Sequence, residues 1–176
     1  MSETKANEIV RAVTTEDLPA VLRWRNHPDV RRYMYQSHEI TLAEHSAWFE
    51  RVSADTGHHL CIVESGRVPL GFVQFKRAGN GGVVDWGFYL TPEAPRGSGR
   101  RLGRAALSHA FGPLALHKVC GQALAFNERS IALHRALGFE DEGVLRDQHF
   151  DGEQYHSVYC FGILATEWPI PGGQAS

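Results

Sequence analysis

The sequence is poor in several features that would assign it to a specialised class of protein. Only three of its 176 residues are cysteines, and Cys61, Cys120 and Cys160 have no clustered spacing. Lys and Arg number 18 against 20 Asp and Glu, a net charge of −2 at pH 7. The charge balance therefore gives no sign of a nucleic-acid or membrane-surface partner. The odd, scattered cysteines argue against a disulfide framework.

Long apolar segments are also missing. The first eight residues, MSETKANE, are polar and lack the apolar core of a signal peptide. No stretch approaches the roughly 18 apolar residues that a membrane span requires. We therefore expect a cytoplasmic protein with reduced cysteines that binds no membrane and no nucleic acid.

Metal-binding motifs are absent although the chain contains ten histidines. His58 and His59 are adjacent, so in a strand they would point to opposite faces. There is no His-x-His, His-Glu-x-x-His or Cys-x-x-Cys spacing. The sequence predicts no metal cofactor.

What is present is typical of one globular domain. Hydrophobic residues make up 43% and charged residues 22% of the chain, and the length suits a single core. We find no repeat, low-complexity segment or linker. We therefore predict a single domain over 1–176, with a core at about 9–165 and a loose tail at 170–176.

The periodicity of apolar residues predicts alternating strands and helices. Strands are expected where β-branched and aromatic residues run between turn signals, over 9–13, 59–64, 68–76, 83–90, 118–126, 144–150 and 154–164. Helices are expected after capping residues and along repeats of three and four, over 14–26, 30–35, 42–52, 100–111 and 127–137. This order predicts an α+β fold, a mostly antiparallel sheet with helices on both faces.

A proline- and glycine-rich turn, 91–99, organises the predicted site. Pro92 and Pro95 end the preceding strand because proline cannot donate to a ladder. Gly97 and Gly99 allow the backbone to approach a ligand closely. The amides that open the next helix lack internal acceptors and carry partial positive charge. The turn is thus a candidate phosphate site, with an ordinary surface turn as the alternative.

Two further features accompany this turn. Ser98 is a candidate cap for the helix, and Gly103 is read as a close-packing residue inside it. Arginines cluster around the turn, at Arg96, Arg100, Arg101 and Arg104. The cluster favours binding of an anion; the alternative is a solvated helix face.

Two motifs carry a resemblance to a known family. The residues RGSG at 96–99 and NERSIALHRALGF at 127–139 resemble the GNAT family of N-acetyltransferases. The family's pyrophosphate loop reads Gln/Arg-x-x-Gly-x-Gly/Ala, and here Ala94 stands at the first position, with Arg96 as the nearby cation. The resemblance implies a twisted mixed sheet whose strands splay at the site of acetyl-CoA, the expected cosubstrate.

The resemblance also implies which residues hold acetyl-CoA. The strand edge at Tyr89 and Leu90 would pair with the pantetheine arm. A backbone amide near Gly87 and Phe88 would polarise the acetyl carbonyl; a plain β-bulge is the alternative for Gly87. The predicted cofactor-binding residues are Phe88, Tyr89, Leu90, Arg96, Gly97, Ser98, Gly99, Arg100, Arg101, Asn127, Ser130, Leu133 and His134.

Asn127 and His134 are the predicted catalytic residues. The family often has Tyr at the position of His134, as general acid for the departing thiolate, and we expect His134 to donate this proton. The alternative is a hydrogen-bonded helix histidine without a catalytic role. Candidates for the general base are chosen by residue type alone and are His45, Glu44, Asp85 and His149.

A narrower likeness concerns the acceptor. Segments such as WRN at 24–26 and LHKV at 116–119 resemble the pseudaminic-acid-pathway acetyltransferases, which act on the 4-amino group of a UDP-linked 4-amino-4,6-dideoxy sugar. The partner expected from this likeness is a nucleotide amino sugar. The predicted substrate-binding residues are Trp24, Arg25, Arg31, Met34, Tyr35, His45 and Phe49, with core packing as the alternative for each.

Other functions stay open at this stage. The acceptor of an acetyltransferase could instead be a ribosomal-protein N-terminus, a polyamine or another small amine. A non-catalytic acetyl-CoA-binding domain is the alternative of a different class. A homodimer is compatible with the sequence, which does not determine the oligomeric state.

Overall fold

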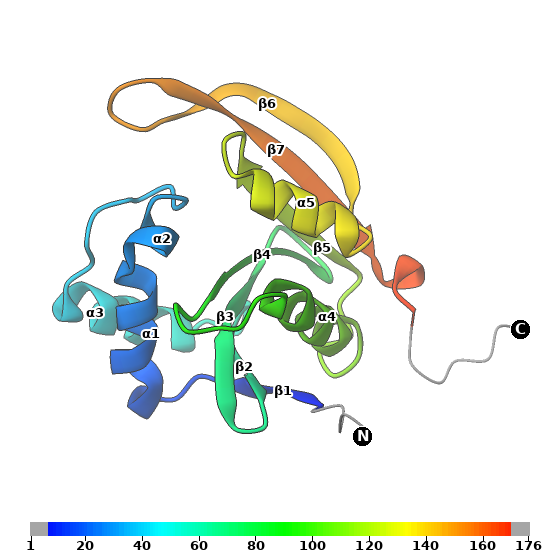
Figure 1. Cartoon of the computed structure of the whole chain (residues 1–176). Helices are drawn as coiled ribbons and strands as arrows, with labels where there is room; N and C mark the ends of the chain where they lie inside the picture. Colours follow the sequence, from blue (N-terminus) through cyan, green and yellow to red (C-terminus); the bar gives the residue numbers. More distant parts are fainter. Residues whose placement is uncertain (1–6, 170–176) are drawn as a thin grey trace, which may run out of the picture.

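The structure is a computed structural model that describes residues 7–169 (Figure 1). The predicted tail at 170–176 lies outside these residues. The strands are β1 (Glu8–Ala12), β2 (His58–Ser65), β3 (Val68–Arg77), β4 (Val83–Leu90), β5 (Lys118–Leu124), β6 (Glu140–Phe150) and β7 (Tyr155–Leu164). The helices are η1 (Thr15–Asp17), α1 (Leu18–Asn26), α2 (Pro28–Arg31), α3 (Leu42–Ser53), α4 (Ser98–Phe111), α5 (Glu128–Ala136) and η2 (Ala165–Glu167).

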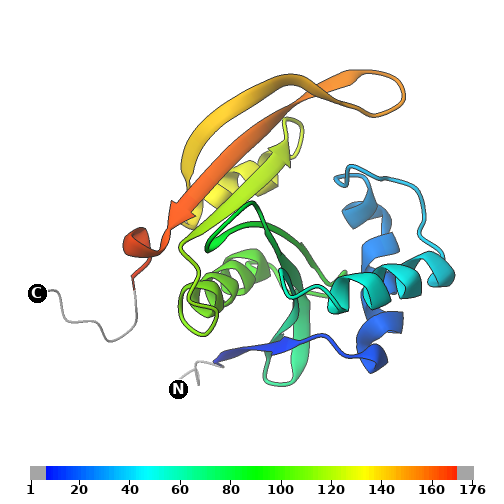
Figure 2. The ribbon, with the colours of Figure 1, turned by 180° about the vertical axis from the view of Figure 1, so that it is seen from behind.

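The strands form one seven-stranded sheet in the order β1-β2-β3-β4-β5-β7-β6. Every neighbouring pair is antiparallel except β4 and β5, which are parallel. Helices α4 and α5 cover one face and α1 and α3 cover the other, as the two opposite views show (Figures 1 and 2). The predicted α+β fold, with a mostly antiparallel sheet between helices, is confirmed.

Strict alternation along β4 divides its side chains between the two faces. Val84 and Trp86 belong to the core cluster that contains α4 and α5, and Phe88 packs against that cluster. Tyr89 packs instead on the cluster built around α1 and α3, where its ring stacks on Phe72 with centroids 5.0 Å apart. The strand therefore contacts both layers of helices.

Most predicted elements are present, and several differ in their bounds. The short helix expected at 30–35 is α2, which ends at Arg31. Strand β6 begins at Glu140, earlier than predicted, because its polar first residues pair with β7 through irregularities on both sides of Val144. Ser98 does not cap α4: Gly97 is the N-cap, with φ of 88°, and Ser98 is the first helical residue. The left-handed conformation at the cap is one that glycine adopts without strain.

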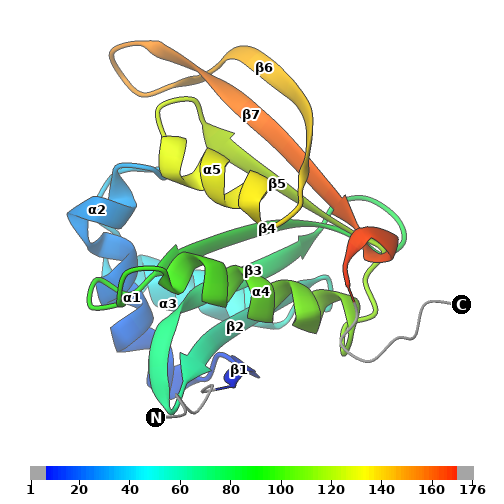
Figure 3. The ribbon, with the colours of Figure 1, turned by 45° about the vertical axis from the view of Figure 1, so that its right-hand side comes forward.

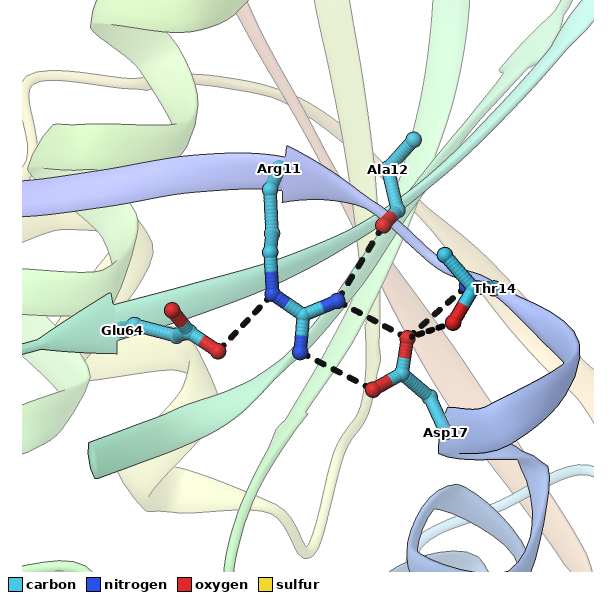
Figure 4. A network of polar contacts seen from close by, with 5 residues as sticks. All are labelled: Arg11, Ala12, Thr14, Asp17 and Glu64. Carbon is cyan, nitrogen blue, oxygen red and sulfur yellow. Dashed lines mark hydrogen bonds and ion pairs between the residues drawn. The ribbon is translucent and has the colours of Figure 1, made fainter. Parts of the chain in front are cut away.

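The first strand is tied to the following helical turn by a charged network (Figure 4). The guanidinium of Arg11 donates to both carboxylate oxygens of Asp17, at 2.8 and 2.9 Å, and to Glu64 at 2.8 Å. The Thr14 amide also donates to Asp17. These donors lower the pKa of Asp17 to about 2, with the Arg11 hydrogen bond as the largest cause. The network fixes the path of the chain between β1 and α1.

Helices α4 and α5 pack closely because Gly103 lacks a side chain. A Cβ at Gly103 would lie 2.5 Å from Cδ1 of Leu137, so this close contact requires glycine. The packing role predicted for Gly103 is confirmed. At 14 residues, α4 is the longest helix between residues 7 and 169, so no helix there has the length and apolar character to span a membrane.

Candidate active site

The central feature of the site is the separation of β4 from β5. The two strands pair only at Val83–Lys118, Val84–Val119 and Asp85–Cys120. Beyond Asp85, β4 continues to Leu90 paired with β3 alone, while β5 continues paired with β7. Figure 3 shows the strands moving apart toward their C-terminal ends. The predicted splay is therefore present as an opening in the sheet.

The opening leaves backbone groups of β4 without a strand partner. The Thr91 amide donates to Leu70 and the Val83 carbonyl accepts from Ala78, so odd-numbered residues of β4 direct their backbone groups toward the β3 side. By alternation, the N–H and C=O groups of Phe88 and Leu90 face the opening. This edge can accept an extended chain as an added strand.

Two predictions for this edge are refined by the pairing. The backbone groups of Tyr89 face β3, and its side chain lies on the α1–α3 face. Gly87 pairs with Gln74 in unbroken register, so it is not a bulge. Of the predicted pair Gly87 and Phe88, Phe88 is the one whose backbone groups face the opening.

Both helices that follow the diverging strands start at the same end of the opening (Figure 3). Because β4 and β5 are parallel and each leads into a helix, their N-terminal amides share one edge of the sheet. The Ser98 amide donates to the Pro95 carbonyl at 3.1 Å, which leaves Gly99 and Arg100 as first-turn donors of α4. A Cβ on Gly99 would contact Leu133 of α5 and Leu90 of β4. The turn is thus directed into the opening.

The arginines predicted around the turn do not act as one cluster. Arg101 forms an ion pair with Glu8 at 2.7 Å and donates to the Ser65 hydroxyl, so it ties α4 to β1 and β2 instead of facing the turn. Its predicted role in phosphate binding is not supported. The remaining members are exposed and form no ion pair with the described residues; they are Arg96, Arg100 and Arg104.

Helix α5 brings its predicted residues to two different places. Asn127 is the N-cap, and its side-chain oxygen accepts from the Ser130 amide at 3.2 Å. Leu133 packs toward α4 beside Gly99. His134 points into the core, where it is 1% exposed.

The hydrogen bonds of His134 fix its protonation. Nδ1 lies 2.7 Å from the Ser130 carbonyl, which only accepts, so Nδ1 carries the proton. Nε2 accepts from the indole Nε1 of Trp86 at 3.0 Å. Burial lowers the pKa of His134, partly offset by the bond to Ser130. A neutral ring with both nitrogens engaged has no proton to give to a thiolate. These contacts favour the alternative interpretation, a hydrogen-bonded helix histidine without a catalytic role, over the predicted general acid.

The predicted substrate-binding residues separate into two groups. The first lies among α1, α3 and the end of β4: Trp24 and Phe49 pack in the core cluster there, as their alternative reading expected. His45 is 4% exposed and stacks on Trp48. The Nη2 of Arg25 donates to the Gln36 carbonyl at 2.7 Å.

Buried polar atoms in this first group lack partners. Within residues 7–169, Nη1 of Arg25, Nδ1 of His45 and Nε1 of Trp24 have no hydrogen-bond partner. Burial lowers the pKa of His45, and the charge of Arg25 lowers it further. Burial likewise lowers the pKa of Arg25, while nearby Tyr89 raises it. Unpaired buried groups of this kind are costly unless a ligand or water satisfies them.

The second group lies at the outer end of β5. Met34 and Tyr35 line a cavity of about 360 Å³ between the segment after α2 and the β6–β7 hairpin. The Tyr35 hydroxyl donates to Oε1 of Gln122 at 2.8 Å. Arg31 faces Glu39 at 3.6 Å, and its charge also lowers the pKa of Arg25, so it lies near the first group.

The structure also separates the four candidate bases. Glu44 accepts from the amide and hydroxyl of Thr41 in a capping box and is committed to starting α3. His45 is buried, and His149 lines the cavity beside Tyr35. Asp85 is exposed at the last paired position before the opening.

Three residues of the site went unpredicted: Trp86, Gly121 and Gln122. Gly121 carries a signal, because glycine in the middle of a strand often marks a close approach. Trp86 carries a weaker sequence signal, because a buried indole N–H requires an acceptor.

Between residues 7 and 169, no group of three or more His, Cys, Asp or Glu side chains is placed to hold a metal ion. The absence of a metal cofactor stays a prediction.

Comparisons with known proteins agree with this geometry. A family model described as acetyltransferase (GNAT) domain matches residues 9–140. A prophage-derived, uncharacterized N-acetyltransferase of Bacillus subtilis is 29% identical over 175 residues, 97% of each chain. The spermidine N(1)-acetyltransferase of Escherichia coli is 25% identical over 161 residues, 90% of this chain and 87% of that one.

Solved structures share the fold. The spermidine N-acetyltransferase of Vibrio cholerae, in complex with CoA and spermine, superposes with a TM-score of 0.85 at 22% identity, covering 93% of this chain and 98% of that one. A GNAT acetyltransferase of Bacillus anthracis gives a TM-score of 0.77 at 18% identity, covering 92% and 96%. The characterised substrates named among these proteins are polyamines, and the narrower likeness to the pseudaminic-acid enzymes gains no support from them.

Proposed function

The chain belongs to the acetyltransferase (GNAT) domain family and is an acetyl-CoA-dependent N-acetyltransferase, and we propose that its acceptor is the primary amine of a small molecule that also carries an anionic group. The opening between β4 and β5 would hold the thioester, with the pantetheine arm along the edge at Phe88 and Leu90. The first-turn amides of α4 at Gly99 and Arg100 would receive the pyrophosphate.

The reaction proposed is direct transfer in a ternary complex. The neutral amine nitrogen attacks the thioester carbon, a C–N bond forms and the C–S bond breaks. If the acceptor arrives as an ammonium ion, one proton leaves to a base and a second N–H proton ends on the CoA sulfur. The products are the N-acetyl amide and CoA thiol. The Phe88 amide is the proposed donor to the carbonyl oxygen as negative charge develops there.

The observation that carries the anionic acceptor is the half-buried guanidinium of Arg25, whose Nη1 atom is shielded from solvent. It lies beside Tyr89, close to where β4 borders the opening, and Nη1 has no partner among residues 7–169. A fixed positive charge near the acceptor repels a polycation and favours a phosphate or carboxylate. The charge of Arg25 acts on His45, whose Nδ1 also has no partner among residues 7–169, and we propose that the two side chains share such a ligand. A nucleotide amino sugar meets this requirement.

A polyamine is the second candidate, and two observations favour it. The characterised relatives compared above are named for spermidine. In addition, the carboxylates of Asp151 and Glu153 line the cavity beside Tyr35, and a polycation would pair with them. Asp151 is already engaged by the hairpin turn, since it accepts from the amides of Glu153 and Gln154.

Asp85 is the proposed base. Its side chain shares a face of β4 with Gly87 and Tyr89, which is the face opposite α4 and α5. It stands at the last paired position before the opening, exposed to water. A carboxylate there would take the ammonium proton through a bridging water.

The experiment that tests the proposal measures CoA thiol release with acetyl-CoA and three acceptors: a UDP-4-amino-4,6-dideoxy sugar, spermidine and a ribosomal N-terminal peptide. The expected result is turnover with the nucleotide sugar and loss of at least tenfold in kcat/KM for Arg25→Met. Arg51→Met, an exposed arginine of α3, is the matched control and should keep wild-type activity. Turnover with spermidine that survives Arg25→Met would establish the polyamine instead. Acetyl-CoA binding without turnover of any acceptor would support a binding domain.

A further inference from the structure

We propose that His134 is a positioning residue that, together with Trp86, holds β4 and β5 apart where the thioester binds. The inference rests on the proposed function only for the identity of the ligand in the opening. The arrangement of the two rings is a property of the fold.

The two rings occupy the point at which the strands part. The last paired residues are Asp85 and Cys120, so continued pairing would bring Trp86 beside Gly121. The hydrogen bond from Trp86 Nε1 to His134 Nε2 lies there instead. A Cβ on Gly121 would fall 2.7 Å from Trp86 Nε1 and closer still to His134 Nε2. Glycine at this position leaves the space that the bonded pair fills.

Aromatic rings pack around the wedge formed by Trp86 and His134. The His134 ring stacks on Phe161, with centroids 4.8 Å apart and an interplanar angle of 11°, and meets Phe139 edge-on at 5.0 Å. Phe88, whose backbone faces the opening, packs on both rings at 4.8 Å from Trp86 and 5.9 Å from His134. A shift of His134 would therefore move Phe88 directly.

The same geometry keeps the imidazole out of proton transfer. Protonation at Nε2 would set its new N–H against the indole N–H of Trp86, so two donors would face each other. The Nδ1 proton is held by the Ser130 carbonyl at 2.7 Å. Burial lowers the pKa of His134, and the bond to the Ser130 carbonyl raises it by a smaller amount. The CoA thiolate then takes its proton from the acceptor nitrogen through solvent.

The test separates positioning from acid catalysis with variants and spectroscopy. His134→Gln retains an acceptor for the indole, whereas His134→Phe leaves the indole N–H unpaired. We expect kcat within threefold of wild type for His134→Gln. For His134→Phe we expect at least a tenfold loss of kcat/KM with a raised KM for acetyl-CoA. The pH profile of kcat should be the same for wild type and His134→Gln. Equal loss of kcat in both variants, with a limb of the profile abolished, would overturn the proposal.

A second measurement does not depend on turnover. Nitrogen-15 NMR of the full chain should show His134 as the neutral Nδ1–H form at pH 7, with and without acetyl-CoA, and a downfield Trp86 indole proton that Gly121→Ala displaces. A protonated Nε2, or an unchanged indole signal in Gly121→Ala, would refute the wedge. Calorimetry with acetyl-CoA distinguishes failure of the wedge proposal from failure of the proposed function. If NMR shows the wedge intact but calorimetry detects no acetyl-CoA binding, only the proposed function is contradicted.

Discussion

The hydroxyl of Tyr35 donates a hydrogen bond of 2.8 Å to Oε1 of Gln122, joining residues 87 apart in sequence. Gln122 lies two residues past the last position at which β5 pairs with β4. The bond therefore links the segment after α2 to the part of β5 that borders the opening. The Tyr35 ring also meets His149 of β6 at 5.1 Å, so three separate segments meet at this point.

Removing this hydroxyl should affect the acceptor more than the cosubstrate. Tyr35→Phe keeps the ring but leaves Gln122 without its donor, so the segment after α2 should be held less firmly. We expect the acceptor KM to rise about threefold to tenfold, equivalent to roughly 0.7 to 1.4 kcal/mol for a neutral hydrogen bond, while the KM for acetyl-CoA stays unchanged. Steady-state kinetics with each substrate varied in turn measures both values. An equal rise in both constants would contradict this assignment.

The conformation of Gly97 should control binding of acetyl-CoA. Its φ of 88° is left-handed and a Cβ there would meet nothing within 4 Å, so Gly97→Ala adds backbone strain without a clash. Strain of about 1 to 2 kcal/mol should disturb the start of α4 and weaken acetyl-CoA binding about fivefold to thirtyfold in calorimetry.

Gly79 supplies a matched control for that change. Its φ is 89°, it is equally open, and it lies in the loop between β3 and β4. Gly79→Ala should lose comparable stability in urea denaturation while retaining wild-type affinity for acetyl-CoA. Equal loss of affinity in both variants would show that the turn at Gly97 has no special role.

Stability should fall as the pH drops below about 6.5, the ordinary pKa of histidine. Burial lowers the pKa of His134, His45 and His109 in the folded state. Below pH 6.5 the unfolded chain binds protons that the folded chain does not, so the free energy of unfolding decreases. Urea denaturation at pH 8, 6.5 and 5 measures this slope.

Comparison with a variant isolates the share of His134. His134→Gln cannot titrate, so its free energy of unfolding should fall less steeply between pH 6.5 and 5 than that of wild type. His45 and His109 should account for the slope that remains. Identical slopes in the two proteins would mean that the folded state does not suppress protonation of His134.

A second acid-dependent loss should come from Asp17. Its folded-state pKa of about 2 is below the ordinary value of 3.8, so its stabilisation is complete above pH 3.8 and is lost as pH falls toward 2. Asp17→Asn should lower the free energy of unfolding by about 1 to 2 kcal/mol at pH 7 and by less at pH 2.5. Glu50→Gln, at an exposed position of α3, should change it little at either pH. A constant difference at both pH values would contradict the charged network.

The sequence by itself determined most of the elements and the glycine turn between β4 and α4. Local signals suffice for these, because caps, glycines and apolar periodicity act within a few residues. The Thr41–Glu44 capping box begins α3. The N-cap of α4 is Gly97, one residue before the predicted cap Ser98. The motif after Asn127 likewise marked a helix at its observed position.

Only the tertiary structure decided which side chains face the opening. Arg101 appeared to belong to the turn but pairs with Glu8, 93 residues away, and His134 is turned inward by Trp86, 48 residues away. Likewise, the segment after α2 places Tyr35 beside β5, where it contacts Gln122, and not beside Trp24 in the core cluster of α1. The partners of a polar side chain are set by strands and helices that meet across the sheet. Spacing along the chain fixes the face of an element, but the hydrogen-bond partner on that face depends on the packing of distant segments.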